Sequence, residues 1–195
     1  MKRKDTLALV ASMVVSAGLM GWIVWSQRPA ETPVAAAAAP STESATTPPT
    51  PELPSLDAAR VAELQATADQ DPANVQARVD LGTLFLEAQR FEEAVSWFEA
   101  ALALEPDDVD RSTDLGVAYY YGGDLDQALE QFDRSLEIEP AHAETLLHVG
   151  VVRAFGKQDL EGAIAAWEEV QRVVPGSLEA MAAADAIERL RSAHP

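Results

Sequence analysis

Four prolines in the later part of the chain recur at a nearly constant interval, and this period constrains the fold more than any other feature. Pro72, Pro106, Pro140 and Pro175 are separated by 34, 34 and 35 residues. Each follows one stretch with helical character and precedes another. Proline ends a helix because it lacks the backbone N–H and clashes with the preceding turn. A period of this length predicts a stack of helix pairs that share one core.

The same residue types return at matching places in three units, which are residues 75–108, 109–142 and 143–177. Each unit has a glycine at its eighth position, followed by an alanine and then an aromatic four residues after that alanine. In chain order these residues are Gly82, Ala94 and Phe98, then Gly116, Ala128 and Phe132, then Gly150, Ala163 and Trp167.

This pattern resembles the tetratricopeptide repeat (TPR) over about 103 residues. In that family, a small eighth residue lets the two helices of a unit approach, and the later small and aromatic residues fill the space between them. The resemblance implies an all-α TPR superhelical solenoid of three repeats. It also implies that the first helix of each unit lines a concave face that binds other polypeptides.

Three departures from the family pattern stand out. The fourth position, where the family often has a large aromatic, holds Arg78, Ser112 and Leu146. The third unit has one extra residue between Gly150 and Ala163. It also places Arg153 where the first two units have Phe85 and Tyr119. We therefore expect an altered turn between the two helices of the third unit.

Two flanking helices complete a TPR domain over residues 55–195. Residues 55–70 precede the first unit, and residues 178–191 follow the third, with Ser177 placed to cap the last helix. Its apolar side chains are expected to cover the last repeat, and these are Leu178, Met181, Ile187 and Leu190. The domain should contain eight helices of about 12–16 residues, as helix pairs in such repeats require.

The N-terminal part of the chain has a different character. Residues 6–25 carry no charge, and about 20 apolar residues are enough to cross a bilayer as a helix. Three basic residues lie within residues 1–5, which favours a cytoplasmic N-terminus and delivers the rest of the chain outside the cytoplasm. A cleaved signal peptide is the alternative, although its apolar core is usually only about 7–15 residues long. The sequence thus predicts one N-terminal transmembrane anchor.

Residues 26–54 hold seven of the 12 prolines, together with many Ala, Thr and Ser residues. A segment of this composition cannot bury enough apolar surface to fold. We expect a disordered linker that tethers the folded domain to the membrane.

Charge narrows the class of partner. Residues 1–54 are neutral overall, so residues 55–195 carry the whole net charge of −18. A surface this acidic repels nucleic acid and anionic lipid, so we expect no nucleic-acid partner. It favours a partner with basic residues, although simple solubility would also explain it.

The sequence shows no group of residues typical of a catalytic or metal-binding site. The chain has no cysteine, which excludes a disulfide, a thiolate metal site and a thioether haem attachment. His142 and His148 are six residues apart and do not share a helical face. We therefore expect no cofactor, no metal site and no enzyme activity.

A candidate peptide-binding groove follows from helical spacing. Positions 2, 5, 9 and 12 of each unit fall on one stripe of its first helix. We add the aromatic or apolar residues that follow at the edge. The predicted groove residues are Val79, Thr83, Leu86, Thr113, Val117, Tyr120, Tyr121, Leu147, Val151, Ala154 and Phe155. The same residues could instead pack against the flanking helices of the solenoid, and the spacing alone does not decide between these two interpretations.

The ends of this stripe are acidic, with Asp110 and Glu144 at the second position of two units. This favours a polypeptide partner with an apolar or amphipathic segment that also carries Lys or Arg. In the TPR proteins that clamp an acidic C-terminus, several groove positions hold Lys, Asn or Arg. The residues here are not basic, so that clamp is missing.

The anchor, the linker and the repeats together resemble the TPR subunits of bacterial cytochrome c maturation. The resemblance implies a bacterial inner-membrane protein whose C-terminal domain lies in the periplasm. It would hold an unfolded apocytochrome c as a chaperone. The alternative is a structural adaptor in another envelope assembly, such as secretion, cell division, a pilus or outer-membrane biogenesis. The sequence leaves the oligomeric state open.

Overall fold

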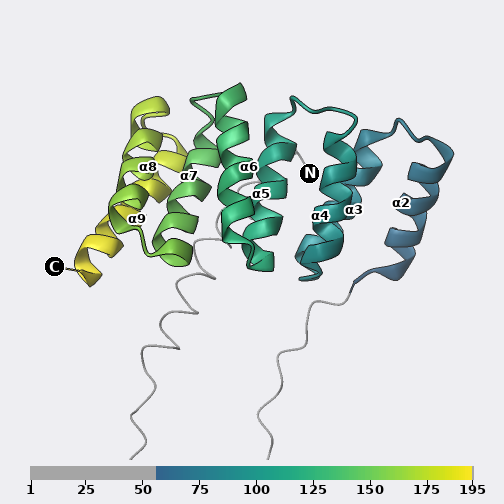
Figure 1. Cartoon of the computed structure of the whole chain (residues 1–195), viewed down its shortest axis with the longest axis horizontal. Coiled ribbons are helices and arrows are strands. Elements are labelled where there is room, and N and C mark those ends of the chain that lie inside the picture. Colours follow the sequence, from purple (N-terminus) through teal and green to yellow (C-terminus); the bar gives the residue numbers. More distant parts are fainter. Residues whose placement is uncertain (1–55, 195) are drawn as a thin grey trace, which may run out of the picture. The chain divides into compact units, whose positions relative to one another are not determined.

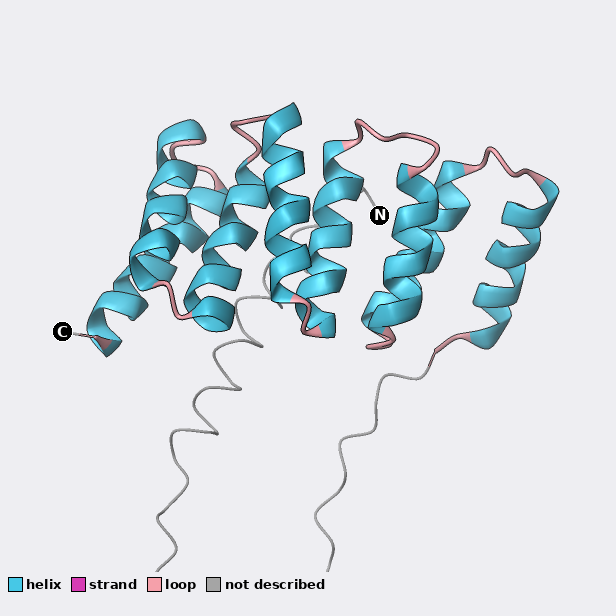
Figure 2. Cartoon of the chain, viewed as in Figure 1, coloured by secondary structure: helices cyan, strands magenta, loops and turns pink. Residues whose placement is uncertain are grey.

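The computed structural model describes residues 56–194, and this part of the chain is built from helices joined by short turns (Figures 1 and 2). The predicted cytoplasmic residues 1–5, anchor 6–25 and linker 26–54 lie outside the described residues. The helices are α2 Ala58–Gln70, α3 Val75–Glu87, α4 Phe91–Leu102, α5 Val109–Gly122, α6 Leu125–Ile138, α7 Ala143–Val151, η1 Val152–Lys157, α8 Leu160–Val173 and α9 Leu178–Ala193. Among residues 56–194, no helix is both long and apolar enough to cross a membrane.

Local sequence signals set most helix starts. Asp57, Asn74, Asp108, Asp159 and Ser177 each stand just before a helix, and each side chain accepts a hydrogen bond from a backbone N–H of the first turn. Such caps satisfy donors that the helix itself leaves unpaired. The recurring prolines lie in the turns before α3, α5, α7 and α9, as their spacing predicts.

The two helices of each unit meet at its glycine. A Cβ built on Gly82 would lie 2.7 Å from the Phe98 ring, and one on Gly116 would lie 2.4 Å from the Phe132 ring. At Gly150 the nearest atom would be Nε1 of Trp167, at 2.1 Å. No real Cβ fits at these distances, so each aromatic ring packs directly on bare helix backbone. The expected small-residue and aromatic contact is therefore confirmed in all three units.

The third unit accommodates its extra residue in η1, a π-helical stretch that continues α7. In the first two units the turn residue with positive φ is the fifteenth, Gln89 (59°) and Gly123 (92°). In the third unit it is the sixteenth, Gln158 (57°). A π-helical turn takes up one additional residue without ending the helix. The altered turn is thus confirmed, and α7 spans only nine residues rather than the expected length.

Neighbouring helices in the sequence are neighbours in space, and the stack curves. Within residues 56–194, the first helices approach each other, since α5 contacts α7 and α7 contacts α9. The second helices α4, α6 and α8 make no comparable contact with one another. The first helices therefore lie on the inner side of the curve. Figure 1 shows α2 to α9 following one another in a single row.

The last helix differs from its expected packing. Ala180, Ala183, Ile187 and Leu190 are buried against the third unit, whereas Leu178 and Met181 are 70% and 59% exposed. The prediction that Leu178 and Met181 cover the last repeat is wrong. The buried residues follow i, i+3, i+7 and i+10 spacing, which defines a face that excludes the first and fourth residues of α9.

Candidate functional site

The predicted groove residues lie on α3, α5, α7 and η1, at the inner side of the stack, and they differ widely in exposure. Phe155 is exposed, at 38%, and four others are partly exposed, namely Thr83, Leu86, Tyr120 and Tyr121. The remaining six are buried, namely Val79, Thr113, Val117, Leu147, Val151 and Ala154. The accessible members are therefore concentrated toward the C-terminal ends of the first helices.

The buried members pack between units. Val79 belongs to a core cluster with Leu81 and Leu115, which joins the first unit to the second. Val117 packs with Val149 and Val152, which joins the second unit to the third. These side chains hold neighbouring units together beneath the more exposed residues of the predicted stripe.

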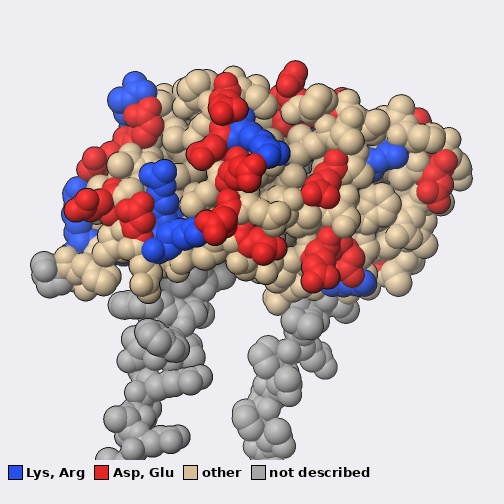
Figure 3. All heavy atoms as spheres, viewed as in Figure 1, with Lys and Arg blue, Asp and Glu red and all other residues tan. Residues whose placement is uncertain are grey.

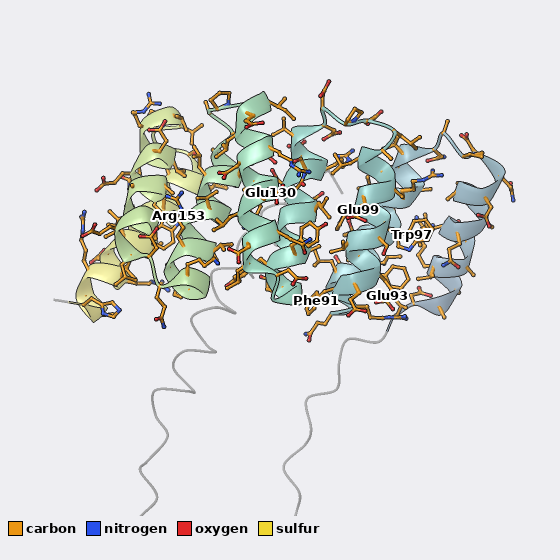
Figure 4. The ribbon with its side chains drawn as sticks, in the orientation of Figure 1. Phe91, Glu93, Trp97, Glu99, Glu130 and Arg153 are labelled. Carbon is orange, nitrogen blue, oxygen red and sulfur yellow. The ribbon has the colours of Figure 1, made fainter. Side chains whose placement is uncertain are left out.

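An aromatic cluster stands at one end of the groove. The rings of Tyr120 and Tyr121 lie 5.3 Å apart between centroids, and Tyr121 stacks on Phe91 of α4 at 5.9 Å. Figure 4 shows Phe91 at the start of α4. Burial raises the pKa of Tyr120, and burial with the neighbouring Tyr120 raises that of Tyr121 to about 12. Both phenols therefore stay neutral over the physiological pH range and act as hydrogen-bonding groups on an apolar surface.

An acidic cluster stands at the opposite end of the first helices, formed by Asp110 and Asp114 of α5 and Glu144 of α7. Burial raises the pKa of Asp114 to about 7, and the carboxylate of Glu144 adds to the rise while Arg111 opposes it. At Glu144, burial also opposes ionisation. His148 Nε2, 3.9 Å from its carboxylate, outweighs that effect and lowers the pKa.

The two arginines near this cluster are bound at the starts of their own helices, although Arg111 also acts on Asp114. Arg78 Nη1 donates a hydrogen bond to the backbone oxygen of Asn74 at 2.7 Å. Arg111 Nε lies 3.7 Å from the capping carboxylate of Asp108. Both arginines are thus held at the starts of their own helices, and the cluster retains a net negative charge.

Hydrogen bonds across the acidic end fix α5 against α7. The Thr113 and Thr145 hydroxyls are 2.6 Å apart and both residues are buried. His142 Nδ1 lies 2.7 Å from the Thr145 hydroxyl, and His142 Nε2 lies 3.2 Å from Asp110. The carboxylates therefore sit on a rigid junction between the second and third units.

Comparison with known proteins agrees with this architecture. Two family models, both described as tetratricopeptide repeat, match residues 56–109 and 85–147. Residues 56–147 are thus similar to the tetratricopeptide-repeat family. No curated protein sequence matches the chain significantly.

Several solved structures share the TPR fold. The crystal structure of MamA superposes with a TM-score of 0.56 at 16% identity, covering 68% of this chain and 85% of MamA. The first TPR of Spaghetti (RPAP3), bound to the HSP90 peptide SRMEEVD, gives 0.54 at 18% identity, covering 61% and 91%. The type III secretion translocator chaperone SycD of Yersinia enterocolitica gives 0.57 at 15% identity, covering 61% and 92%. At these identities the likeness establishes the fold alone.

The predicted stripe omits several residues that the structure places beside it. Asp80, Asp114 and His148 occupy the sixth position of the three units, which lies four residues from the second position and so shares its helical face. Phe91 was missed because it belongs to a second helix. Within residues 56–194, no group of three or more His, Cys, Asp or Glu side chains could hold a metal ion.

Proposed function

We propose that the TPR domain binds polypeptide segments that combine apolar side chains with Lys or Arg, and that it holds them rather than acting on them chemically. The observation that carries this proposal is the division of the first helices into an aromatic end and an acidic end. A basic side chain would lie against Asp110, Asp114 and Glu144, while an apolar one would contact Tyr120 and Tyr121. TPR proteins mediate protein–protein interactions, which supports the binding class.

The charge of the first helices favours basic over acidic polypeptide segments. The HSP90 peptide bound to the Spaghetti TPR carries two Glu and one Asp. In this chain the corresponding first helices are acidic, with their arginines held at the helix starts. A segment of opposite charge to that peptide therefore fits this groove.

The sequence features of residues 1–54 extend the proposal. Residues 6–25 would anchor the protein in a bacterial inner membrane, and residues 26–54 would tether the TPR domain in the periplasm. The resemblance to cytochrome c maturation subunits makes an unfolded apocytochrome c the first client to test. The exposed Phe155 at the edge of the groove supports this assignment, because an unfolded client offers apolar side chains to exposed rings.

The test is photo-crosslinking of the full chain in its own cells, with a photoreactive residue at Phe155. Adducts with several secreted polypeptides, apocytochromes c among them, support the holding function. Adducts with one folded envelope protein at fixed stoichiometry would replace it with the structural adaptor function. The matched control is a photoreactive residue at Asp133, an exposed position on α6. If Asp133 captures the same polypeptides, or Phe155 captures only its own chain, the groove is not the binding site.

A further inference from the structure

A hollow on the outer side of the stack carries an inference that is independent of the groove. Its walls come from α4, α5 and α6 around the second unit, and its volume is about 340 Å³. Small-molecule pockets in proteins begin at about 300 Å³. We call it the Ser112 hollow, after the residue at its floor.

The hollow opens because two second helices diverge over a short side chain. The helices α4 and α6 both pack on α5 but make little contact with each other. Ser112, at the fourth position of the second unit, faces the space between them. The third unit has Leu146 at this position, which is 7% exposed and occupies its own space. The second unit leaves the space open.

The walls and the floor of the hollow have different chemistry. Leu102, Leu115 and Ile138 provide apolar walls, whereas Ser112 and Gln131 provide the polar floor. Gln131 Nε2 donates to the Ser112 hydroxyl at 2.7 Å. Gln131 is only 8% exposed, and among residues 56–194 no donor reaches its amide oxygen. This oxygen is not sealed from solvent, so it can accept a hydrogen bond from a ligand in the hollow that supplies an N–H.

In the first unit, a side chain of the protein itself occupies the equivalent space. Gln131 is the twenty-third residue of the second unit, and the twenty-third residue of the first unit is Trp97. Trp97 packs against the core cluster that contains Val61 and Leu64 of α2. Figure 4 shows Trp97 in the space between α4 and α2, and Glu99 on the opposite side of α4, toward α6. The first unit therefore fills this space with its own indole.

The residues at the rim of the Ser112 hollow restrict which ligands can enter it. Tyr119 donates from its hydroxyl to Glu99 Oε1 at 2.8 Å, which closes the hollow where α4 meets α5. Burial, followed by the hydrogen bond to Glu99, raises the pKa of Tyr119 to about 12, so this link persists at physiological pH. Figure 3 shows Asp and Glu side chains gathered over α4 and α6 on this face. Arg134 also lines the hollow but is paired with Glu130 of the same helix. A neutral ring with a donor therefore fits this rim better than an anionic group.

We propose that the Ser112 hollow is a second docking site, which receives the tryptophan side chain of a partner protein. The apolar walls would contact the indole ring, and the indole N–H would donate to the free amide oxygen of Gln131. The site lies on the outer side of the solenoid, so it can be occupied while the groove holds a client.

The test uses indole as the probe and NMR titration of the isotope-labelled full chain as the measurement. Indole should shift the side-chain amide signal of Gln131 and the backbone signal of Ser112. 1-Methylindole has the same ring without the N–H, and it should bind roughly fivefold more weakly because one hydrogen bond is lost. Gln131→Trp copies the first unit and should abolish the shift of the Ser112 backbone signal, which remains observable in this variant.

Ser112→Leu copies the third unit and provides a second test if Gln131→Trp does not fold. It should also abolish the response to indole while leaving crosslinking at Phe155 unchanged, which separates this site from the proposed groove function. The proposal is overturned if indole does not shift Gln131 and Ser112, if both probes bind equally, or if a folded filled variant still responds.

Discussion

Each first helix of the domain has two faces that follow different rules. On the face toward the second helix, Gly82, Gly116 and Gly150 meet an aromatic ring in the same way in all three units. At the sixth position the residue varies: it is Asp80 in the first unit, Asp114 in the second and His148 in the third, and His148 is buried and stacks on the Phe132 ring. The repeated face therefore specifies the fold, whereas the varied face carries the residues that the proposed function assigns to partner binding.

The two faces also differ in how strongly packing restricts substitution. Groups on the repeated face are close-packed, so a single added methyl must displace an aromatic ring. Groups on the groove face are packed less uniformly, since some are buried and others are partly exposed, so their substitution should act mainly through charge rather than through close packing. Three substitutions test this division, taken from the largest expected effect on stability to the smallest.

Gly116→Ala should have the largest effect, because its Cβ would lie 2.4 Å from the Phe132 ring. We expect a loss of about 3 kcal/mol in the free energy of unfolding, measured by urea denaturation. Gly122→Ala is the matched control in the same helix, since its Cβ would meet only Phe91 Cβ at an ordinary 3.6 Å. That control should be neutral or slightly stabilising. Equal losses in the two variants would show that the glycine contact has no special role.

Asp114→Asn should have an intermediate effect that depends on pH. The pKa of Asp114 is raised to about 7 in the folded state, whereas it is about 3.9 in an unfolded chain. The folded state therefore binds the proton more tightly, and ionisation of Asp114 destabilises the fold increasingly as pH rises from about 4 to 7. The variant should be about 2 kcal/mol more stable at pH 8, allowing for partial solvation, and the gain should vanish near pH 4.

The measurement for Asp114→Asn is urea denaturation at a series of pH values. Asp133→Asn is the control, because Asp133 is exposed on α6 and should show no such gain. A gain for Asp114→Asn that is the same at pH 4 and pH 8 would rule out the titration of this carboxyl as its cause.

Trp167→Phe should have the smallest effect of the three. It keeps a ring over Gly150 but removes the hydrogen bond from Trp167 Nε1 to the backbone oxygen of Leu147, which is 3.1 Å long and buried. We expect a loss of about 1 kcal/mol in the free energy of unfolding. Phe98→Leu in the first unit removes a ring without a hydrogen bond and provides the comparison. If Trp167→Phe costs as much as Gly116→Ala, the indole N–H rather than the ring dominates this contact.

The sequence predicts the repeated face well, because the glycine and aromatic residues recur with the period and have only one way to pack. It predicts the groove face less well. Spacing puts Val79 and Val117 on the groove stripe, but the curvature of the stack buries them between neighbouring first helices. The curvature depends on contacts between whole helices. It therefore cannot be predicted from the residue spacing within one helix.

The same limit explains the third unit and the last helix. An extra residue near Gly156 predicts an altered turn, but either a longer loop or a π-helical stretch could absorb it. In the structure a π-helical stretch absorbs it, and Arg153 of η1, which Figure 4 labels beside α8, donates from Nη1 to the backbone oxygen of Gly162 at 3.4 Å. The exposure of Leu178 and Met181 likewise depends on how α9 docks on α8.

The most direct test of the central claim is a binding measurement on the full chain with two peptides. Both peptides form the same amphipathic helix with one apolar face, and the polar face carries Lys in one and Glu in the other. The groove account predicts that the Lys peptide binds at least about tenfold more tightly by fluorescence anisotropy at low salt. It also predicts that Asp114→Asn and Tyr120→Ala each weaken this binding, whereas Asp133→Asn does not. Equal binding of the two peptides, or binding that neither groove variant changes, would contradict the account.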